Sequence, residues 1–535
     1  MKRNSIKILT GLILGFLIVY LSSCSMEPEL TDQYTSETPW RNEKNLELYL
    51  NSFYGLLGTT SYYTPNVSDD GYSDVIKFNQ EVDGHNQFVF NTNPVTPSNN
   101  PLDNWAWGHN WVTACNRFID GLHSHGGHFP EEVQLRAEAE ARFFRAHVYF
   151  MMARRFGGRV VIHRELPDMD IKDRRLSEPD ECWDFIAEDL DFAAEHLPVT
   201  AVKGKLVKGG AYGLKARAML YAKRWEAASD AAKEVIDLDI YELYPDYAAL
   251  FKMERGKGND MNNKESILEV GYSAPDFGYS FDYFYSPKGD GGYAEVAPTE
   301  NLVMNYLIKN ESGEYVEFDW NNPAHAADPY NNREPRFYQT VLYNGAEWKD
   351  RTIETFEGGR DAMTQGAGGT TTGYYLRKLF DENQRGGFDK SGLTLYYLRY
   401  AEVLLIYAEA MAEQNDLETA YLYLNEVRER GGLDPLPVGT KNDFNRELRR
   451  ERMIELAFEG HRFWDLRRWG IAKNILNGVS MKGVRTLKNT DGTFSYELVD
   501  CERKKRVYLD GYDSFPIPSA ELQKNQLAEQ TDIWK

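Results

Sequence analysis

Apolar positions recur with helical spacing in two blocks of the chain. The pattern predicts helices at about 41–57, 105–122, 131–156, 180–196, 208–223 and 225–238 in the first block, and at about 396–414, 417–430, 442–459 and 461–476 in the second. Apolar residues three and four positions apart form one face of a helix, and that face must be buried against another element. The chain is therefore predicted to be mainly α-helical.

Within each block the predicted helices come in pairs. The segments YGLKARAMLYAKRWEAASDAAKEVIDL (212–238) and LRYAEVLLIYAEAMAEQNDLETAYLYLNEVR (398–428) share an Ala-rich first helix, a short polar turn and a second helix with one apolar face. Small residues let two helices approach closely, as in tetratricopeptide repeats, whose neighbouring hairpins cover the remaining apolar face. We expect about four degenerate tetratricopeptide-like hairpins, at 131–196, 208–238, 396–430 and 442–476.

The two blocks, at about 41–238 and 396–476, are separated by residues 240–395, which show no sustained period. Gly, Pro, Asn, Asp and aromatic residues crowd together there, a composition typical of loops and short strands. We interpret this stretch as an irregular, ligand-binding insertion into a single domain, which ends in a C-terminal segment at 477–535. Aromatic residues alternate with others at 279–285, which predicts a strand with one buried face.

The N-terminus has the features of a secretion signal. Lys2, Arg3 and Lys7 precede the apolar run ILTGLILGFLIVYL, which is too short for a membrane-spanning helix. The run ends in LSSC, and small residues before a cysteine at this point are typical of a bacterial lipobox, in which the cysteine is acylated after cleavage. We expect residues 1–23 to be a lipoprotein signal peptide and Cys24 to be the first, lipid-bearing residue of the mature domain 24–535.

The charge balance argues against nucleic acid as a partner. The formal net charge is -21, whereas binding to phosphate backbones depends on clustered Lys and Arg side chains. After Cys24 is assigned, Cys115, Cys182 and Cys501 remain, an odd set whose spacing fits neither a disulfide scaffold nor a metal motif. We interpret them as mostly buried thiols, and leave one disulfide open.

The most basic stretch is LRRERMIELAFEGHRFWDLRRWG (448–470), with six arginines. Its first apolar residues recur at three and four positions and predict one buried face, while Glu451, Glu455 and Glu459 follow one another four apart, where they can neutralise arginines. Gly460 is expected to end this helix, and the tryptophans of the next to stack on guanidinium groups. We interpret the stretch as scaffold and not as a phosphate site.

Several segments resemble the signature of one family. They are NREPRFYQTVLYNG (332–345), TGYYLRK (372–378), YLRYAEVLLIYAEA (397–410), the Arg-rich stretch 448–470 and FPIPSAELQKNQ (515–526). Together they closely resemble the C-terminal signature of SusD/RagB-type outer-membrane lipoproteins, and with the lipobox and the predicted helix at 131–156 the likeness covers essentially the whole chain. The ending NQLAEQTDIWK departs from the QNPG-like ending of relatives, which affects the expected packing of the last ten residues.

This resemblance implies a function. Proteins of the family are surface-exposed, lipid-anchored binding proteins of the outer membrane, not enzymes, and they capture oligosaccharides over the mouth of a SusC-like TonB-dependent transporter. The resemblance thus implies a cell-surface glycan-binding lipoprotein that delivers oligosaccharides to such a partner. A peptide-binding protein of the same family is the nearest alternative. A helical-repeat interaction protein with no small ligand and a surface glycoside hydrolase are the alternatives from other classes.

Candidate ligand residues were chosen on loops that combine aromatic and polar side chains. Sugars present apolar C–H faces to aromatic rings and hydroxyl groups to planar polar side chains. The candidates are Asn104, Trp105 and Trp107 in PLDNWAWGHNW (101–111), Tyr72 and Asp74 in SYYTPNVSDDGYSD (61–74), Tyr279, Tyr283 and Tyr285 in the insertion, and Trp320. Trp111 is expected to face the core. We expect an uncharged ligand, bound mainly by ring stacking and therefore insensitive to salt.

Motifs for metal binding and catalysis are weak. The acids of 61–74 could hold a structural calcium ion, but their spacing fails the EF-hand pattern. The segment HSHGGH (123–128) lacks a further ligand, and QGAGGTTTG (365–373) lacks the Gly-Lys pair of a phosphate loop. We predict no catalytic residue, no metal site and no cofactor.

Overall fold

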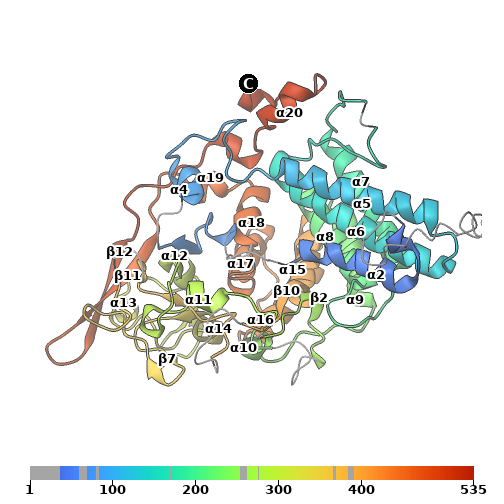
Figure 1. Ribbon diagram of the computed structural model, residues 1–535. Coiled ribbons are helices and arrows are strands. Elements are labelled where there is room, and N and C mark those ends of the chain that lie inside the picture. Colours follow the sequence, from blue (N-terminus) through green and yellow to red (C-terminus); the bar gives the residue numbers. More distant parts are fainter. Residues whose placement is uncertain are drawn as a thin grey trace, which may run out of the picture.

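The computed structural model describes residues 37–58, 69–79, 83–168, 170–253, 262–274, 276–364, 369–382 and 391–535. The predicted signal peptide and Cys24 lie outside these residues, as does most of the loop 61–74. The described chain is mainly helical, as predicted, with short strands in two-stranded sheets (Figure 1). Among the described helices, none combines the length and the apolar character needed to cross a membrane.

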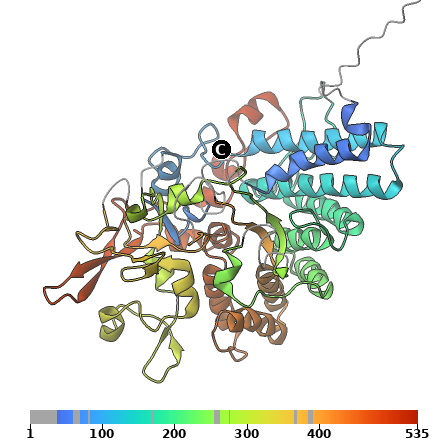
Figure 2. The same ribbon diagram turned by 60° about the horizontal axis from the view of Figure 1, so that its bottom comes forward.

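The long helices form one continuous array. The first block supplies α5 (Trp105–His125), α6 (Glu131–Phe156), α7 (Pro179–His196), α8 (Lys208–Tyr221) and α9 (Trp225–Asp237), and each packs on the next. The second block supplies α15 (Tyr400–Glu413), α16 (Leu417–Arg430) and α17 (Lys441–Glu455); α15 packs on α9, α16 and α17. Helices from distant parts of the sequence therefore stack side by side, and the insertion leaves the array between α9 and α15 (Figures 1 and 2).

Three of the expected hairpins are confirmed and the fourth differs. Helix pairs α6/α7, α8/α9 and α15/α16 correspond to 131–196, 208–238 and 396–430. At 442–476, helix α17 is followed by two short helices, α18 (Arg462–Arg468) and α19 (Ala472–Leu476), in place of one longer partner. The helical path is interrupted at Phe458, Gly460 and Gly470, whose backbone adopts the left-handed conformation, with φ of 67°, 79° and 69°.

The insertion consists of short elements. Its strands pair antiparallel as β2 (Ser266–Val270) with β10 (Leu395–Arg399), β4 (Ile308–Lys309) with β5 (Tyr315–Val316), β6 (Val341–Leu342) with β9 (Tyr375–Leu376), and β7 (Glu347–Trp348) with β8 (Arg351–Thr352). Its helices are α10 (Tyr247–Leu250), α11 (Phe281–Tyr285), α12 (Glu300–Val303), α13 (Pro323–Ala327) and α14 (Pro335–Thr340). Strand β10 leads directly into α15, which joins the insertion to the second helical block.

The flanking segments complete the domain. Near the N-terminus lie α2 (Glu43–Asn51), the 3-10 helix η2 (Ser52–Leu56), β1 (Ile76–Phe78) and α4 (Asp83–Phe90). Strand β1 pairs with β3 (Val296–Pro298) of the insertion. After α19 come the hairpin of β11 (Lys482–Lys488) and β12 (Phe494–Asp500), helix α20 (Ser519–Lys524) and the 3-10 helix η6 (Asp532–Trp534). In the unusual ending, Trp534 donates to the Ser514 carbonyl at 2.7 Å, so these residues pack back on the domain.

The aromatic alternation at 279–285 was predicted to be a strand, and this prediction is wrong. Residues Phe281–Tyr285 form the short helix α11. Phe281 and Tyr285 are buried, whereas Tyr283 is 37% exposed. Two large rings four positions apart fit one face of a helical turn as well as they fit alternation, so the pattern alone did not separate the two structures.

Two hydrophobic cores hold these parts together. The first joins the long helices to the N-terminal segment and to C-terminal residues such as Phe515 and Ile517. The second belongs to the insertion and also contains Met453, Ile454 and Phe458 from the end of α17 and the turn that follows. The three cysteines are free and buried, as predicted, and burial raises the pKa of each thiol to about 12.

Buried ion pairs link the insertion to α17. The Glu455 carboxylate accepts hydrogen bonds from Arg336 at 3.1 Å, from Arg399 at 2.6 Å and from Arg430. All four side chains are nearly inaccessible to solvent. Burial alone would raise the pKa of Glu455, but the charges of Arg430, Arg399 and Arg336 hold it well below its usual range. The Arg-rich stretch is likewise paired, as predicted, with Arg452 on Asp465 at 2.8 Å.

Replacing Glu455 with Gln is expected to lower the free energy of unfolding by about 3–5 kcal/mol, because it removes from a buried network the one carboxylate that three guanidinium groups share. Urea unfolding followed by circular dichroism measures the change. The matched control is Glu188→Gln, which removes a pair with Arg164 whose side chains are 52% and 61% exposed and so should cost at most about 1 kcal/mol. A Glu455→Gln variant as stable as this control would contradict the prediction.

Candidate functional site

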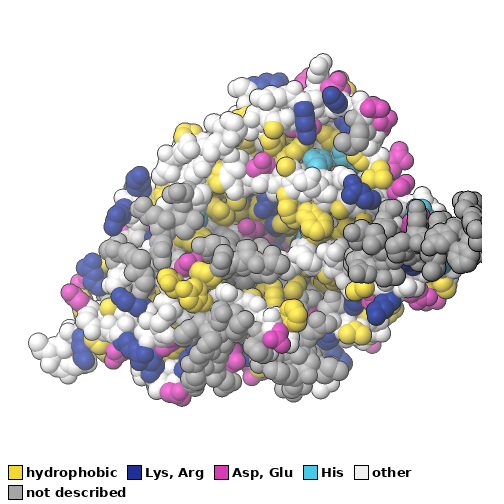
Figure 3. Space-filling model, viewed as in Figure 1, with side chains coloured by type: hydrophobic (Ala, Val, Ile, Leu, Met, Phe, Trp, Pro, Cys, Tyr) yellow, Lys and Arg dark blue, Asp and Glu magenta, His cyan; other side chains and the backbone are white. Residues whose placement is uncertain are grey.

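A cavity of about 400 Å³ lies where the long helices meet the flanking segments. It is lined by residues 55–58 at the end of η2 and after it, Asp69, Trp107 and Trp111 of α5, His147, Phe150, Met151 and Arg154 of α6, Arg217 and Tyr221 of α8, Tyr397 of β10, and Glu459, Gly460 and His461. Hydrophobic side chains gather near the centre of the face shown in Figure 3. The cavity thus draws on both helical blocks and on the N-terminal segment.

Tryptophans from helix α5 form one side of the cavity. Trp107 and Trp111 are four residues apart and therefore share a helix face. Trp107 is 38% exposed, whereas Trp105, two residues earlier, is 3% exposed and donates from Nε1 to Glu521 at 3.2 Å. Within one turn, the helix thus points one tryptophan into the core and the next toward the cavity.

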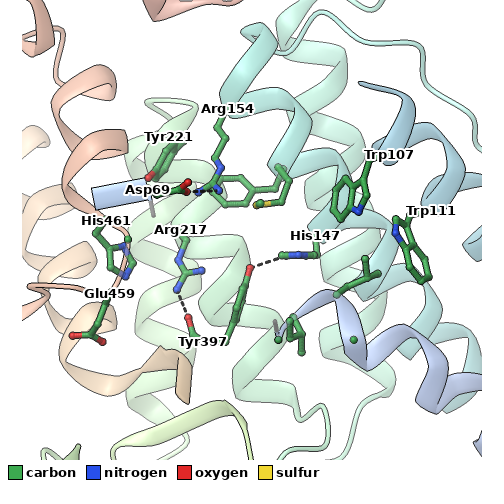
Figure 4. A pocket seen from close by; sticks show the side chains of 17 residues that line it. Asp69, Trp107, Trp111, His147, Arg154, Arg217, Tyr221, Tyr397, Glu459 and His461 are labelled. Carbon is green, nitrogen blue, oxygen red and sulfur yellow. Dashed lines mark hydrogen bonds and ion pairs between the residues drawn. The ribbon is translucent and has the colours of Figure 1, made fainter. Parts of the chain in front are cut away.

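Polar side chains form the opposite side (Figure 4). Tyr397 shares a hydrogen bond with Nδ1 of His147 at 2.7 Å, and Arg217 donates to the Tyr397 carbonyl at 2.8 Å. Arg154 donates to Asp69 at 3.4 Å. Burial, followed by the charges of Arg154 and Arg217, lowers the pKa of His147 to about 3, so this imidazole is neutral at physiological pH. Rings and hydrogen-bonding groups therefore face each other across the space.

The turn after α17 completes the wall. Asp70 accepts hydrogen bonds from the backbone N–H groups of Gly460 at 3.1 Å and Arg462 at 3.2 Å, and Asp74 forms an ion pair with Arg462 at 2.8 Å. Burial raises the pKa of Asp70 to about 8. These acids, which belong to the segment that the sequence suggested for ligand binding, hold the turn that carries Glu459 and His461 in place.

The structure divides the sequence-based candidates by burial. Trp105, Tyr279, Tyr285 and Asp74 are at most 6% exposed, and Tyr72 packs between Phe88 and Phe463. Trp320 is partly buried and donates from Nε1 to Glu300 at 2.8 Å. Asn104 lies just before α5 and donates to the Met151 carbonyl at 3.3 Å. Only Trp107 and Tyr283 present a substantial ring surface to solvent, and only Trp107 lines the cavity.

Apart from Asp69, which belongs to the candidate segment 61–74, the polar residues of the cavity were not among those candidates. His147, Arg154 and Arg217 lie on long helices that the apolar pattern assigned to scaffold, and His461 lies in the Arg-rich stretch with the same assignment. One signal could have identified two of them. His147 in α6 and Arg217 in α8 are polar residues within runs of residues that are buried. A polar side chain in such a position needs a partner or faces a cavity.

A second cavity, of about 440 Å³, lies between residues 161–174 and helix α20. Its lining includes His109, His163, Arg174, Lys524 and Glu521 but no Trp, Tyr or Phe ring. Among the residues that the structure describes, no group of three His, Cys, Asp or Glu side chains is placed to hold a metal ion. The first cavity is therefore the better candidate for a ligand with an apolar face.

The chain matches known proteins along most of its length. Residues 251–534, more than half of the chain, match the model of the SusD family, and residues 30–220 match the model described as starch-binding associating with outer membrane. A SusD-like protein from Bacteroides ovatus is 25% identical over 77% of this chain and 74% of its own.

Solved structures agree with these matches. A SusD-like protein from Bacteroides fragilis is 27% identical, with a TM-score of 0.80 over 93% of this chain and 98% of its own. A SusD-like carbohydrate binding protein from the same species is 24% identical, with a TM-score of 0.79 over 92% of this chain and 100% of its own. The chain belongs to the SusD family.

Proposed function

We propose that this protein is a cell-surface lipoprotein that captures oligosaccharides and delivers them to a SusC-like TonB-dependent transporter in the outer membrane. It binds its cargo without converting it. The observation that carries the proposal is the cavity in which Trp107 and Trp111 face the polar side chains of Arg154, Tyr397 and Asp69. Membership of the SusD family, and the carbohydrate-binding description of one similar structure, support it.

The arrangement fits the two surfaces of a sugar. Exchanging a hydroxyl group's hydrogen bonds with water for bonds to protein gains only about 0.5–1.5 kcal/mol each. Covering an apolar sugar face with a ring removes apolar area from water at about 25 cal/mol per Å². Trp107 supplies an exposed ring for this purpose at the cavity, so it should contribute more to affinity than any single hydroxyl contact.

Replacing Trp107 with Ala is expected to weaken binding of the preferred oligosaccharide about thirtyfold or more, equivalent to about 2 kcal/mol, because the stacking surface is lost. Isothermal titration calorimetry against a panel of plant, microbial and host oligosaccharides measures this change. The matched control is Trp105→Ala, on the same helix but buried, which should cost about 3–5 kcal/mol of stability.

The panel also contains peptides, because a peptide-binding relative is the nearest alternative. Binding of peptides but of no glycan would refute the proposed cargo. Wild-type glycan affinity in the Trp107→Ala variant would refute the assignment of the site. Tyr283→Ala, in the insertion, tests whether the exposed ring of α11 adds to binding.

The lipid anchor is tested at Cys24, which follows the apolar run at the end of LSSC. Cys24→Ala should move the protein from the membrane fraction to the soluble fraction, because no acyl chain can then be attached. Phase separation in detergent, with mass spectrometry of the N-terminal peptide of the wild type, measures the outcome. A variant that still partitions into the detergent phase would rule out Cys24 as the anchor.

The transporter is tested by purification from native membranes. The tagged, lipidated protein, isolated from outer membranes in mild detergent, should carry with it a TonB-dependent barrel in a fixed ratio. The Trp107→Ala variant should retain the barrel, because Trp107 is assigned to ligand binding and not to the partner. Recovery of the protein alone, under conditions that keep other outer-membrane complexes intact, would count against this partnership.

A further inference from the structure

Two guanidinium groups in the cavity have unused hydrogen-bond donors. Within the described residues, Arg154 donates a single hydrogen bond, from Nη2 to Asp69, and its buried Nε has no acceptor. Arg217 uses Nε and Nη2 on Glu402 and on the carbonyl of Tyr397, and no described residue accepts from its Nη1. A guanidinium group has five N–H donors and no acceptor, so Nη1 of each arginine can still donate to a further acceptor.

The carboxylates of the cavity do not supply that acceptor. Glu459 accepts from Lys378 at 2.7 Å through Oε1 and from Arg399 at 2.7 Å through Oε2. Asp69 accepts through Oδ2 from Trp464 at 2.7 Å as well as from Arg154. Both acids are thus already engaged with cations or donors.

Positive charge also accumulates behind the cavity, around Trp464. The guanidinium carbons of Arg154, Arg155 and Arg467 lie 4.0, 4.8 and 4.8 Å from the centre of the Trp464 ring. Arg155 and Arg467 donate to backbone carbonyls, and neither forms an ion pair within the described residues. Burial, followed by the charge of Arg154, lowers the pKa of Arg155 to about 9.

We propose that the cavity accepts a sugar residue that carries a negatively charged group, a carboxylate or a sulfate ester, which binds Arg154 and Arg217 while the sugar ring lies against Trp107. The inference rests on the proposed glycan-binding function and replaces the expectation of an uncharged ligand. The N–H groups of a guanidinium group bind both kinds of anion through charge-assisted hydrogen bonds. Figure 4 shows the tryptophans and Arg154 on different sides of the same cavity.

The test compares each oligosaccharide of the panel in three forms: with hexuronate units, with the carboxylates reduced to neutral hexoses, and with sulfate esters on the neutral form. At least one anionic form should bind about tenfold or more tightly than the neutral form in calorimetry at low salt. This advantage should shrink at high salt, because screening weakens the attraction. Separate titration of the uronate and the sulfate ester shows which anion is preferred.

Equal affinity for the three forms would overturn this inference and leave glycan capture intact. The absence of binding by every form of every glycan would overturn the proposed function itself. The two failures are therefore distinct.

Two variants test whether Arg154 causes the preference for the anionic form. Arg154→Gln should remove most of the advantage of the anionic form, measured as the ratio of the two affinities in the same variant. Asp69→Asn should increase the advantage, because it removes the competing carboxylate while the amide oxygen can still accept from Trp464. The matched control is Arg175→Gln, whose pair with Glu181 is exposed and outside the cavity. An unchanged ratio in both Arg154→Gln and Asp69→Asn would overturn the assignment, and Asp69→Asn alone decides it if Arg154→Gln does not fold.

Discussion

The buried carboxylate of Glu455 is the contact on which the arrangement of the two parts of the chain depends. Its three guanidinium partners come from different places: Arg336 from helix α14 of the insertion, Arg399 from the end of strand β10, and Arg430 from the end of α16. Removing ionic groups from water is costly, and the cost is offset only when each charge meets its partners in good geometry. Three separate segments donate to one carboxylate. The network therefore fixes how the insertion is positioned against the helices.

The same charges shape the wall of the cavity. Arg399 donates to the carbonyl of Glu455 at 2.8 Å, and Lys378 donates to the carbonyl of Ala457 at 2.8 Å. These cations satisfy carbonyls that a longer helix would have bonded internally, so α17 ends at Glu455, five residues before the Gly460 at which the sequence suggested a stop. The turn then brings Glu459 and His461 to the cavity. A wall fixed by buried charges is already ordered before a ligand arrives, which lowers the entropic cost of binding.

Features that depend on interactions between residues close in sequence were predictable. Features that depend on residues far apart in sequence were not. The long helices and the first three hairpins were predictable, because apolar periodicity is a local property of each segment. The break after α17 was not, because it depends on Lys378 and Arg399, which lie far away in the sequence. Trp107 was predicted because aromatic and polar residues crowd together at 101–111, although the structure places it in helix α5 and not in a loop. Arg154 and Arg217 were not predicted, since the sequence does not show which arginines of a helix line a cavity and keep N–H donors without an acceptor.

The charged residues of helix α6 differ in how completely their hydrogen bonds are satisfied, and this difference matters for the site. Arg145 meets Asp189 at 2.7 Å, Glu140 meets Arg136 at 2.7 Å and Glu138 meets Arg142, so the middle of the helix has matched charges. At its C-terminal end, Arg154 retains free donors beside a cavity. Unbonded N–H donors are costly in a closed core, but a cavity admits water, which can bond to these donors at little cost in enthalpy. A ligand with a suitable acceptor replaces that water, so donors that a closed core would not tolerate become a means of recognition.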